Sequence, residues 1–323
     1  MSTSRSLGTL ALRMLTIRYF LRRLGGAVPT LFLIVTASFF LMRLAPGGPF
    51  DREQALPADV AANLNASYGL DQPLVAQYAR YLVALAHGDF GPSFRYRDFS
   101  VTDLIAQGMP VSLGLGATAL ALALCCGVLL GCLSALYRHS FVDYATLALT
   151  VAAIAIPSFV LLPFLGLVFG IHLHWLPVAG WQGGDLRHLV LPVAVLSLPP
   201  LAYIARMTRA SLLEVLKKPY LRTAFAKGLP AHTVILRHAL RPALLPVAGY
   251  LAPAVASIMT GSLVVETIAG LPGIGRYLVQ GALNRDYTLV LGMVIVYSTI
   301  LIAMGLLVDL LYLWLDPRIR LEA

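Results

Sequence analysis

Long apolar runs dominate this chain and limit what it can fold into. They predict membrane-spanning helices at 18–44, 111–136, 144–170, 189–205, 243–265 and 288–314. A helix needs about 20 mostly apolar residues to cross the hydrocarbon core of a bilayer, with a range of about 17–25. Only 12% of the residues are charged, about half the share usual in soluble domains. The sequence therefore predicts an all-α integral membrane protein with about six transmembrane helices.

The charged residues between the apolar runs predict the orientation of the chain. Basic residues gather in 1–17 and just after it, in 206–242 and in 316–323, whereas acidic and basic residues roughly balance in 45–103. Loops rich in lysine and arginine stay in the cytoplasm. We therefore expect both termini and the 206–242 loop to be cytoplasmic, and the 45–103 segment to be periplasmic. The net charge of +9 is spread over alternating loops, which argues against a nucleic-acid partner.

The first apolar run has two interpretations. It follows a basic amino end, as the apolar part of a cleaved signal peptide does, but such a part has only about 7–15 residues. The run at 18–44 is longer, so we interpret it as an uncleaved first helix. In the polar segment that follows, Pro57–Tyr68 and Pro73–Ala86 have the pattern of short amphipathic helices. We favour a packing role for them over a substrate site, because no reactive groups converge there.

The loop between the fourth and fifth runs contains a short helical stretch. Its residues are Arg222, Thr223, Ala224, Phe225, Ala226, Lys227, Gly228, Leu229 and Pro230. Gly228 suits the left-handed position that ends a helix, and Pro230 prevents continuation. A short helix with small residues between two spans is suited to docking on another protein. The alternative is an ordinary basic loop that lies on anionic lipid headgroups.

A glycine-rich stretch follows the fifth run. Its candidate residues are Glu266, Gly270, Pro272, Gly273 and Gly275. A phosphate-binding loop would need a preceding strand and a Lys-Ser/Thr pair, so we predict a loop at the outer mouth instead. We expect Gly273 and Gly275 to adopt backbone conformations that residues with a Cβ resist.

The third and fourth apolar runs each contain prolines that are candidates for a special role. Pro157 and Pro163 interrupt the third, and Pro199 and Pro200, with Pro192, break the fourth. Proline is tolerated in a membrane helix where neighbours or water satisfy the freed carbonyls. We predict that these residues line the pathway or act as hinges, and a simple kink in a packed helix is the alternative.

Catalytic and metal-binding functions find little support. The cysteines at 125, 126 and 132 lack CxxC spacing, and His172 and His174 lack the i, i+4 spacing of a helical metal pair. No GxxxxGK[ST] sequence is present, so the chain itself has no ATP-binding loop and we expect no enzyme activity. A secondary transporter would carry ionisable groups in mid-span, whereas Glu266 and Asp309 lie near the ends of their runs.

Four passages resemble ABC importer permeases. The stretch Thr223-Ala-Phe-Ala-Lys-Gly-Leu229, with the downstream Leu245-Pro246, resembles their EAA motif, although Arg222-Thr223-Ala224 stands where Glu-Ala-Ala would be. That variant is common in the peptide-importing branch. The other passages are Leu41-Met-Arg-Leu-Ala-Pro-Gly-Gly-Pro49, Gly88-Asp-Phe-Gly-Pro-Ser93, and Glu266 to Gly275 followed by Asn284-Arg-Asp-Tyr287. Together they resemble the first membrane subunit of bacterial oligopeptide importers over about 18–320.

The resemblance implies a type I importer fold, with the transmembrane domain at 109–315, in the bacterial inner membrane. It implies a heterodimer with a second permease, two cytoplasmic ATPases that carry ATP and Mg²⁺, and a periplasmic binding protein. The chain itself would bind no cofactor. The 222–230 stretch would be the coupling helix that inserts into an ATPase. The substrate would be an oligopeptide, or alternatively a dipeptide, a nickel chelate or glutathione. A secondary transporter without ATPases is the alternative from another class.

Overall fold

The computed structural model describes residues 3–44, 63, 66, 69–96 and 98–315, with side chains described between 23 and 310. Its helices are α1 Thr3–Leu44, α3 Leu74–Ala86, α4 Val101–Leu136, α5 Phe141–Ala155, α6 Ser158–Leu165, η1 Gly166–His172, η2 Gln182–Gly184, α7 Arg187–Val215, α8 Pro219–Ala226, α9 Ala231–Thr233, η3 Val234–Ala239, α10 Leu240–Ala243, α11 Leu245–Ala269, α12 Ile274–Leu283 and α13 Tyr287–Leu315. The described residues form no named strand. The all-α prediction is confirmed.

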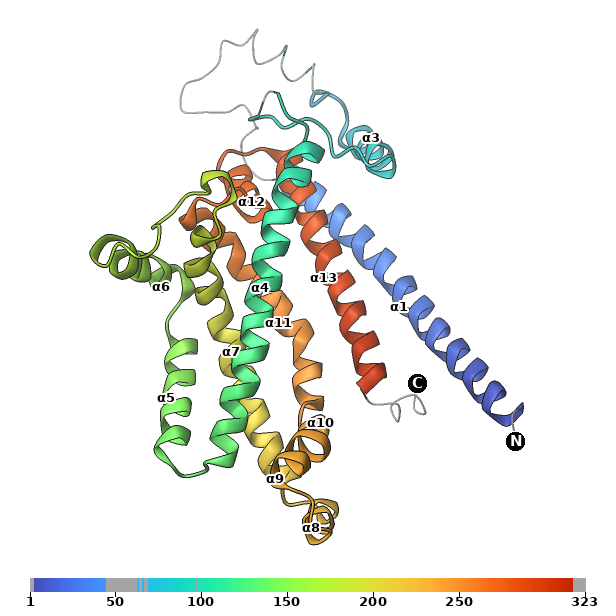
Figure 1. The fold of residues 1–323 in the computed structure, drawn as a ribbon. Coiled ribbons are helices and arrows are strands. Elements are labelled where there is room, and N and C mark those ends of the chain that lie inside the picture. The colour runs from blue at the N-terminus through green and yellow to red at the C-terminus, as the bar shows by residue number, and fades with distance from the viewer. Residues whose placement is uncertain (1–2, 45–62, 64–65, 67–68, 97, 316–323) are drawn as a thin grey trace.

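Five helices are long and apolar enough to cross a membrane. They are α1, α4, α7, α11 and α13, and the bent pair formed by α5 with α6 and η1 brings the number to six if it counts as one span. In Figure 1 the long helices run between an end that carries α3 and α12 and an end that carries α8. The prediction of about six spans agrees with this arrangement.

The pairing of α4 with α7 is the most extensive helix contact in the bundle. Glycine makes the approach possible at two points on α4. A Cβ at Gly127 would lie 2.9 Å from the Cβ of Ile204, and one at Gly131 would lie 2.5 Å from the carbonyl oxygen of Ala205. Small residues let membrane helices pack at close range. The glycines at 127 and 131 therefore set the distance between these two helices.

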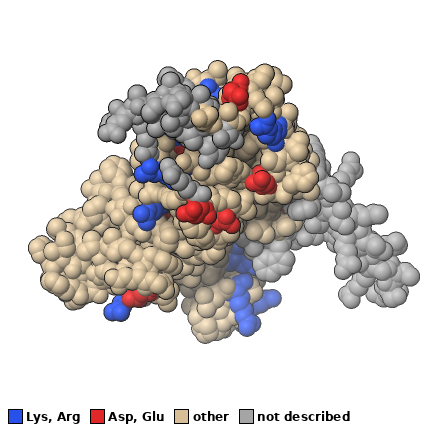
Figure 2. All heavy atoms as spheres, turned by 90° about the horizontal axis from the view of Figure 1, so that it is seen from above, with Lys and Arg blue, Asp and Glu red and all other residues tan. Residues whose placement is uncertain are grey.

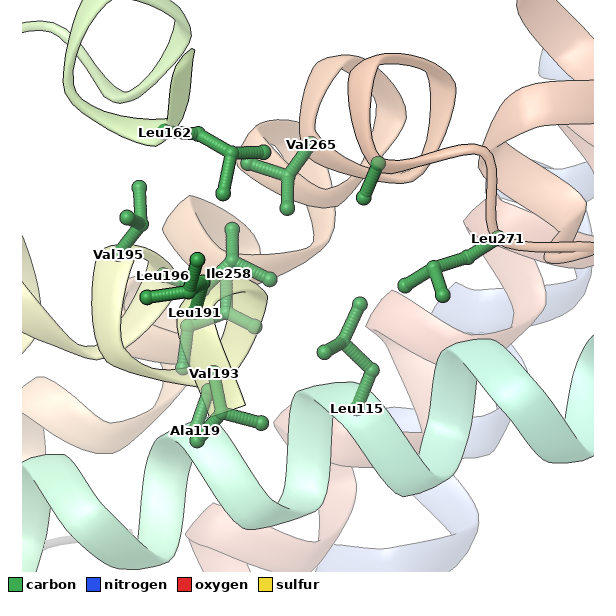
Figure 3. Packing of buried hydrophobic residues seen from close by; sticks show 11 residues of the cluster. Leu115, Ala119, Leu162, Leu191, Val193, Val195, Leu196, Ile258, Val265 and Leu271 are labelled. Carbon is green, nitrogen blue, oxygen red and sulfur yellow. The ribbon is translucent and has the colours of Figure 1, made fainter. Parts of the chain in front are cut away.

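The buried core on the side of α3 and α12 is shared by α4, α6, α7 and α11. Figure 3 shows Leu115 of α4, Leu162 of α6, Leu191 of α7 and Ile258 of α11 within one cluster. All four side chains are buried. Dispersion contacts in such a cluster are individually weak and collectively large, so the core fixes the relative positions of the four helices.

The helices α4 and α7 extend further than the apolar pattern predicts. α4 begins at Val101, not at 111, and α7 continues to Val215, ten residues beyond the predicted end at 205. Ser100 caps α4 in a reciprocal pair of hydrogen bonds with Asp103, a signal that the Ser-x-x-Asp spacing carries. The extension of α7 keeps one side buried through Leu212 and Val215.

The predicted third span is not a straight helix. α5 ends at Ala155, α6 begins at Ser158, and the two axes differ by 105°. Pro157 stands at this break, as predicted, because proline lacks the N–H that would continue the helix. Pro163 was predicted to interrupt the helix, but it lies inside α6. Pro192, Pro199 and Pro200 likewise lie inside the continuous α7, so the prediction that they break the fourth span is wrong.

The first helix is longer than predicted and lies at the edge of the bundle. α1 begins at Thr3, so most of the predicted 1–17 tail is helical. Its main contact is with α13, where Arg23 lies 3.0 Å from the Asp309 carboxylate. Asp309 therefore forms an ion pair with Arg23 near one end of its span, which agrees with its predicted position at the membrane interface. α3 confirms the predicted helix at 73–86, whereas the predicted helix at 57–68 falls largely outside the described residues.

Candidate functional site

The helix α8 is a small projection at one end of the bundle. Figure 1 shows it below α9, apart from the long helices. Leu221 is its one buried residue, 1% exposed, and belongs to a cluster with Leu212 and Val215 of α7 and with Val234 and Ala239 of η3. Ala224 lies one turn further on the same side and packs partly against this cluster. The small size of Ala224 therefore serves the seating of α8 on α7, while Ala226 is exposed.

The C-terminal end of α8 is closed by Gly228. Its φ of +78° lies in the left-handed region, as predicted. Its N–H donates to the carbonyl of Phe225 at 2.9 Å, and the N–H of Leu229 donates to that of Ala224 at 3.4 Å. This pair of bonds defines a Schellman motif. The helix itself starts earlier than predicted, since Pro219 occupies its first turn, where proline is well tolerated.

The outward side of α8 combines apolar and basic residues. Tyr220 and Phe225 are each 47% exposed, and Leu229 is 38% exposed. Exposed bases surround them: Lys217, Lys218, Arg222, Lys227, Arg237 and Arg241. The predicted stretch 222–230 contains most of this surface. It omitted Tyr220 and Leu221, the residue that anchors α8. The two apolar residues directly after Pro219 could have indicated them. An exposed apolar patch rimmed by charge is typical of a protein contact.

The glycine-rich stretch at the other end is organised by a buried carboxylate. Glu266, predicted to lie in an outer loop, instead lies in the last turn of α11 and is fully buried. Its Oε1 accepts a hydrogen bond from Ser112 Oγ at 2.7 Å, and its Oε2 accepts from the N–H of Gly275 at 2.8 Å and of Arg276 at 3.3 Å. Glu266 therefore ties α11 to α4 and to the start of α12.

The glycines around Glu266 are required for space. We expected unusual backbone conformations at Gly273 and Gly275, but Gly273 is extended, with φ −98°, and Gly275 lies inside α12; that prediction is wrong. A Cβ at Gly273 would lie 2.2 Å from Glu266 Oε2, and one at Gly275 would lie 2.7 Å from the same atom. Gly270 alone of the three takes a left-handed φ, +68°, where it ends α11. Pro272 follows it in the connection to α12.

Passages far apart in the sequence meet beside this loop. Ser93 Oγ donates to Asp286 Oδ2 at 2.6 Å, and both residues are buried. The Arg43 guanidinium lies 5.6 Å from the ring centroid of Tyr287, within the range of a cation–π contact. The 41–44, 88–93 and 284–287 passages are thus brought together at one end of the bundle, although nothing in their spacing predicted it.

The predicted pathway prolines are not gathered in one place. Pro157 lies at the α5–α6 break, Pro163 in α6, and Pro199 and Pro200 in α7. Pro200 is buried and Pro199 is half-buried. Of these four prolines, Pro157 stands at the break between two described helices whose axes differ by 105°.

Together, the long apolar helices define a multi-pass membrane protein. Residues 127–321 match the family described as the binding-protein-dependent transport system inner membrane component, and residues 16–116 match the N-terminal family of the same transport systems. The chain belongs to the family of binding-protein-dependent transport system inner membrane components, the permeases of ABC importers. Membership also removes the alternative of a stand-alone secondary transporter.

Relatives match this chain over nearly its whole length. It is 53% identical to the oligopeptide transport system permease protein OppB of Escherichia coli K12, over 94% of this chain and 99% of the relative. The Haemophilus influenzae OppB is 51% identical over the same shares. The dipeptide transport system permease protein DppB of Bacillus subtilis is 45% identical, over 94% of this chain and 98% of the relative.

Proposed function

We propose that this chain is one permease subunit of an ATP-driven importer of oligopeptides, and that α8 couples it to an ATPase. The observation that carries the proposal is the exposed surface formed by Tyr220, Phe225 and Leu229, on a helix that a single buried leucine attaches to α7. Burial of this surface in a groove of another protein would be favourable, since removing apolar area from water drives association.

The partners follow from what the chain does not supply. Its sequence has no phosphate-binding loop of the GxxxxGK[ST] type, so ATP and Mg²⁺ belong to two cytoplasmic ATPase subunits. A second, homologous permease completes the pathway, and a periplasmic binding protein delivers the substrate. Membership of a binding-protein-dependent family supports this assembly.

An oligopeptide substrate is supported by the relatives named for oligopeptide transport, and the dipeptide relative makes dipeptides the second candidate. The test is uptake into proteoliposomes that contain the complete transporter. We expect accumulation of a labelled short oligopeptide that requires both ATP and the binding protein. Uptake driven by an ion gradient without ATP would contradict the proposal. Stronger competition by dipeptides would change the substrate class and leave the transport mechanism in place.

We also propose that α8 faces the cytoplasm and that the loop before α7, which contains Gly183, faces the periplasm. Figure 2 looks onto the end that carries α3 and α12, where acidic and basic side chains lie side by side, whereas the exposed charges of 217–241 are nearly all basic. The positive-inside rule assigns the basic end to the cytoplasm.

This orientation predicts the labelling of two introduced cysteines. In intact cells, Gly183→Cys should react with a thiol reagent that does not cross membranes, and Lys218→Cys should react only after the cells are opened. Both variants need a background in which the three native cysteines are replaced, because Cys125 is exposed in the isolated chain. Reaction of Lys218→Cys from outside would reverse the orientation.

A further inference from the structure

A partly buried ion pair joins α5 to α7. The guanidinium of Arg209 in α7 donates to the carboxylate of Asp143 in α5 through two bonds, Nε to Oδ1 at 2.7 Å and Nη2 to Oδ2 at 2.8 Å. The side chain of Asp143 is 1% exposed and that of Arg209 is 22% exposed. Two parallel bonds of this kind fix the relative orientation of the two side chains as well as their distance.

The same carboxylate also holds the end of α4 and the turn that follows it. Ser134 Oγ in α4 donates to Asp143 Oδ1 at 2.5 Å, and the N–H of His139 donates to Oδ2 at 3.0 Å. His139 has a φ of +62°, which is uncommon for a residue other than glycine. Asp143 therefore stabilises an otherwise unfavourable turn and connects it to α7.

Apart from Asp143, the buried residues of α5 have small side chains. Its buried residues are Asp143, Thr146, Thr150 and Ala153, so no large apolar side chain of α5 is buried. The two threonine hydroxyls donate to carbonyls within α5 itself. The buried side of α5 thus contacts its neighbours through small side chains. The ion pair with Arg209 is the contact that has a defined geometry.

Arg209 lies close to the base of α8 along the chain. It is three residues before Leu212, which packs against Leu221 of α8, and α7 ends at Val215. Displacement of α8 is therefore passed to the end of α7 that carries Arg209. From Asp143, α5 leads to the break at Pro157 and to α6, which packs against α11 and α7.

We propose that the Asp143–Arg209 pair is the positioning element that makes α5 move with α7 when α8 is displaced, so that ATPase closure reaches the bent α5–α6 pair. This inference rests on the proposed function, since it takes α8 as the helix that an ATPase moves. An ion pair with two bonds has a defined geometry, whereas packed helices can also slide past one another by small shear movements.

The test uses the complete transporter in proteoliposomes and separates assembly from coupling. The variants are Arg209→Lys, which keeps the charge but loses the two-bond geometry, and Asp143→Asn with Arg209→Gln, which leaves no unpaired buried charge. Arg206→Gln is the matched control, because Arg206 is exposed on the same helix. We measure co-purification of the ATPases, basal ATP hydrolysis, and hydrolysis with the substrate-loaded binding protein.

We expect both altered transporters to assemble and to keep their basal rate of ATP hydrolysis. In the double variant, the stimulated rate and uptake should fall at least about tenfold. In Arg209→Lys, both should fall by a smaller factor. Normal stimulation in both altered transporters would overturn the proposal, and so would failure of Arg209→Lys to assemble, which would assign the pair to folding alone. If the unaltered transporter shows no stimulation, the proposed function itself fails.

Discussion

Replacing Gly228 with valine is expected to abolish most of the stimulation of ATP hydrolysis by the substrate-loaded binding protein. The left-handed φ of +78° at this position costs a residue with a Cβ about 1–2 kcal/mol, and β-branching makes that conformation still less favourable. Such a cost reduces the population of the closed α8 terminus about tenfold. Apart from Gly228 and its two neighbours in the chain, no atom of the described residues lies within 4 Å of the added Cβ, so the loss would come from the conformation and from the contact with the ATPase.

Two variants make this result specific. Gly183 also has a left-handed φ, +66°, with open space around its Cβ, but it lies in the loop before α7, so Gly183→Val carries a similar conformational cost away from α8 and should leave stimulation near normal. Gly228→Asn should retain more stimulation than Gly228→Val, because asparagine tolerates the left-handed region. Equal stimulation in Gly228→Val and the unaltered transporter would show that α8 is not the coupling helix.

Replacing Gly273 with alanine is expected to disrupt the loop between α11 and α12 and to reduce uptake strongly. The new methyl group would lie 2.2 Å from Glu266 Oε2 and 2.6 Å from Ser112 Oγ, so the hydrogen bonds around the carboxylate must break or the backbone must move. Overpacking of a tight site costs typically about 1–3 kcal/mol, and each buried group left unpaired adds about 1–3 kcal/mol. The measurement is thermal unfolding of the purified permease, together with uptake.

The control for this substitution is Gly305→Ala, since a Cβ at Gly305 meets nothing within 4 Å in α13. Glu266→Ala should resemble Gly273→Ala, because it leaves Ser112 Oγ and two backbone N–H groups without their acceptor. Glu266→Gln keeps one acceptor oxygen and should be milder. If Gly273→Ala unfolds at the temperature of the unaltered permease and transports normally, the close approach of residue 273 to Glu266 is not required for stability or transport.

Local patterns in the sequence predicted the helices and the end of α8. Twenty apolar residues in succession have few alternatives to a membrane helix, so the spans follow from the runs alone. The end of α8 was predictable for a similar reason: Gly228 and Pro230 determine the backbone through their own covalent structure. The predicted helix ends were less accurate. The apolar pattern weakens toward the end of α7, but the helix continues there because Leu212 and Val215 are buried against neighbouring residues.

The role of Glu266 was decided only by the tertiary structure. Its partner Ser112 is 154 residues away, and a carboxylate at the end of an apolar run gives no sign of whether it faces water or a neighbouring helix. The same holds for Asp286 with Ser93, and for Asp143 with Arg209, which are 193 and 66 residues apart. Periodicity reports which side of one helix is apolar. Which polar groups meet depends on how the helices pack against one another, and in this protein those pairs join segments that are far apart in the sequence.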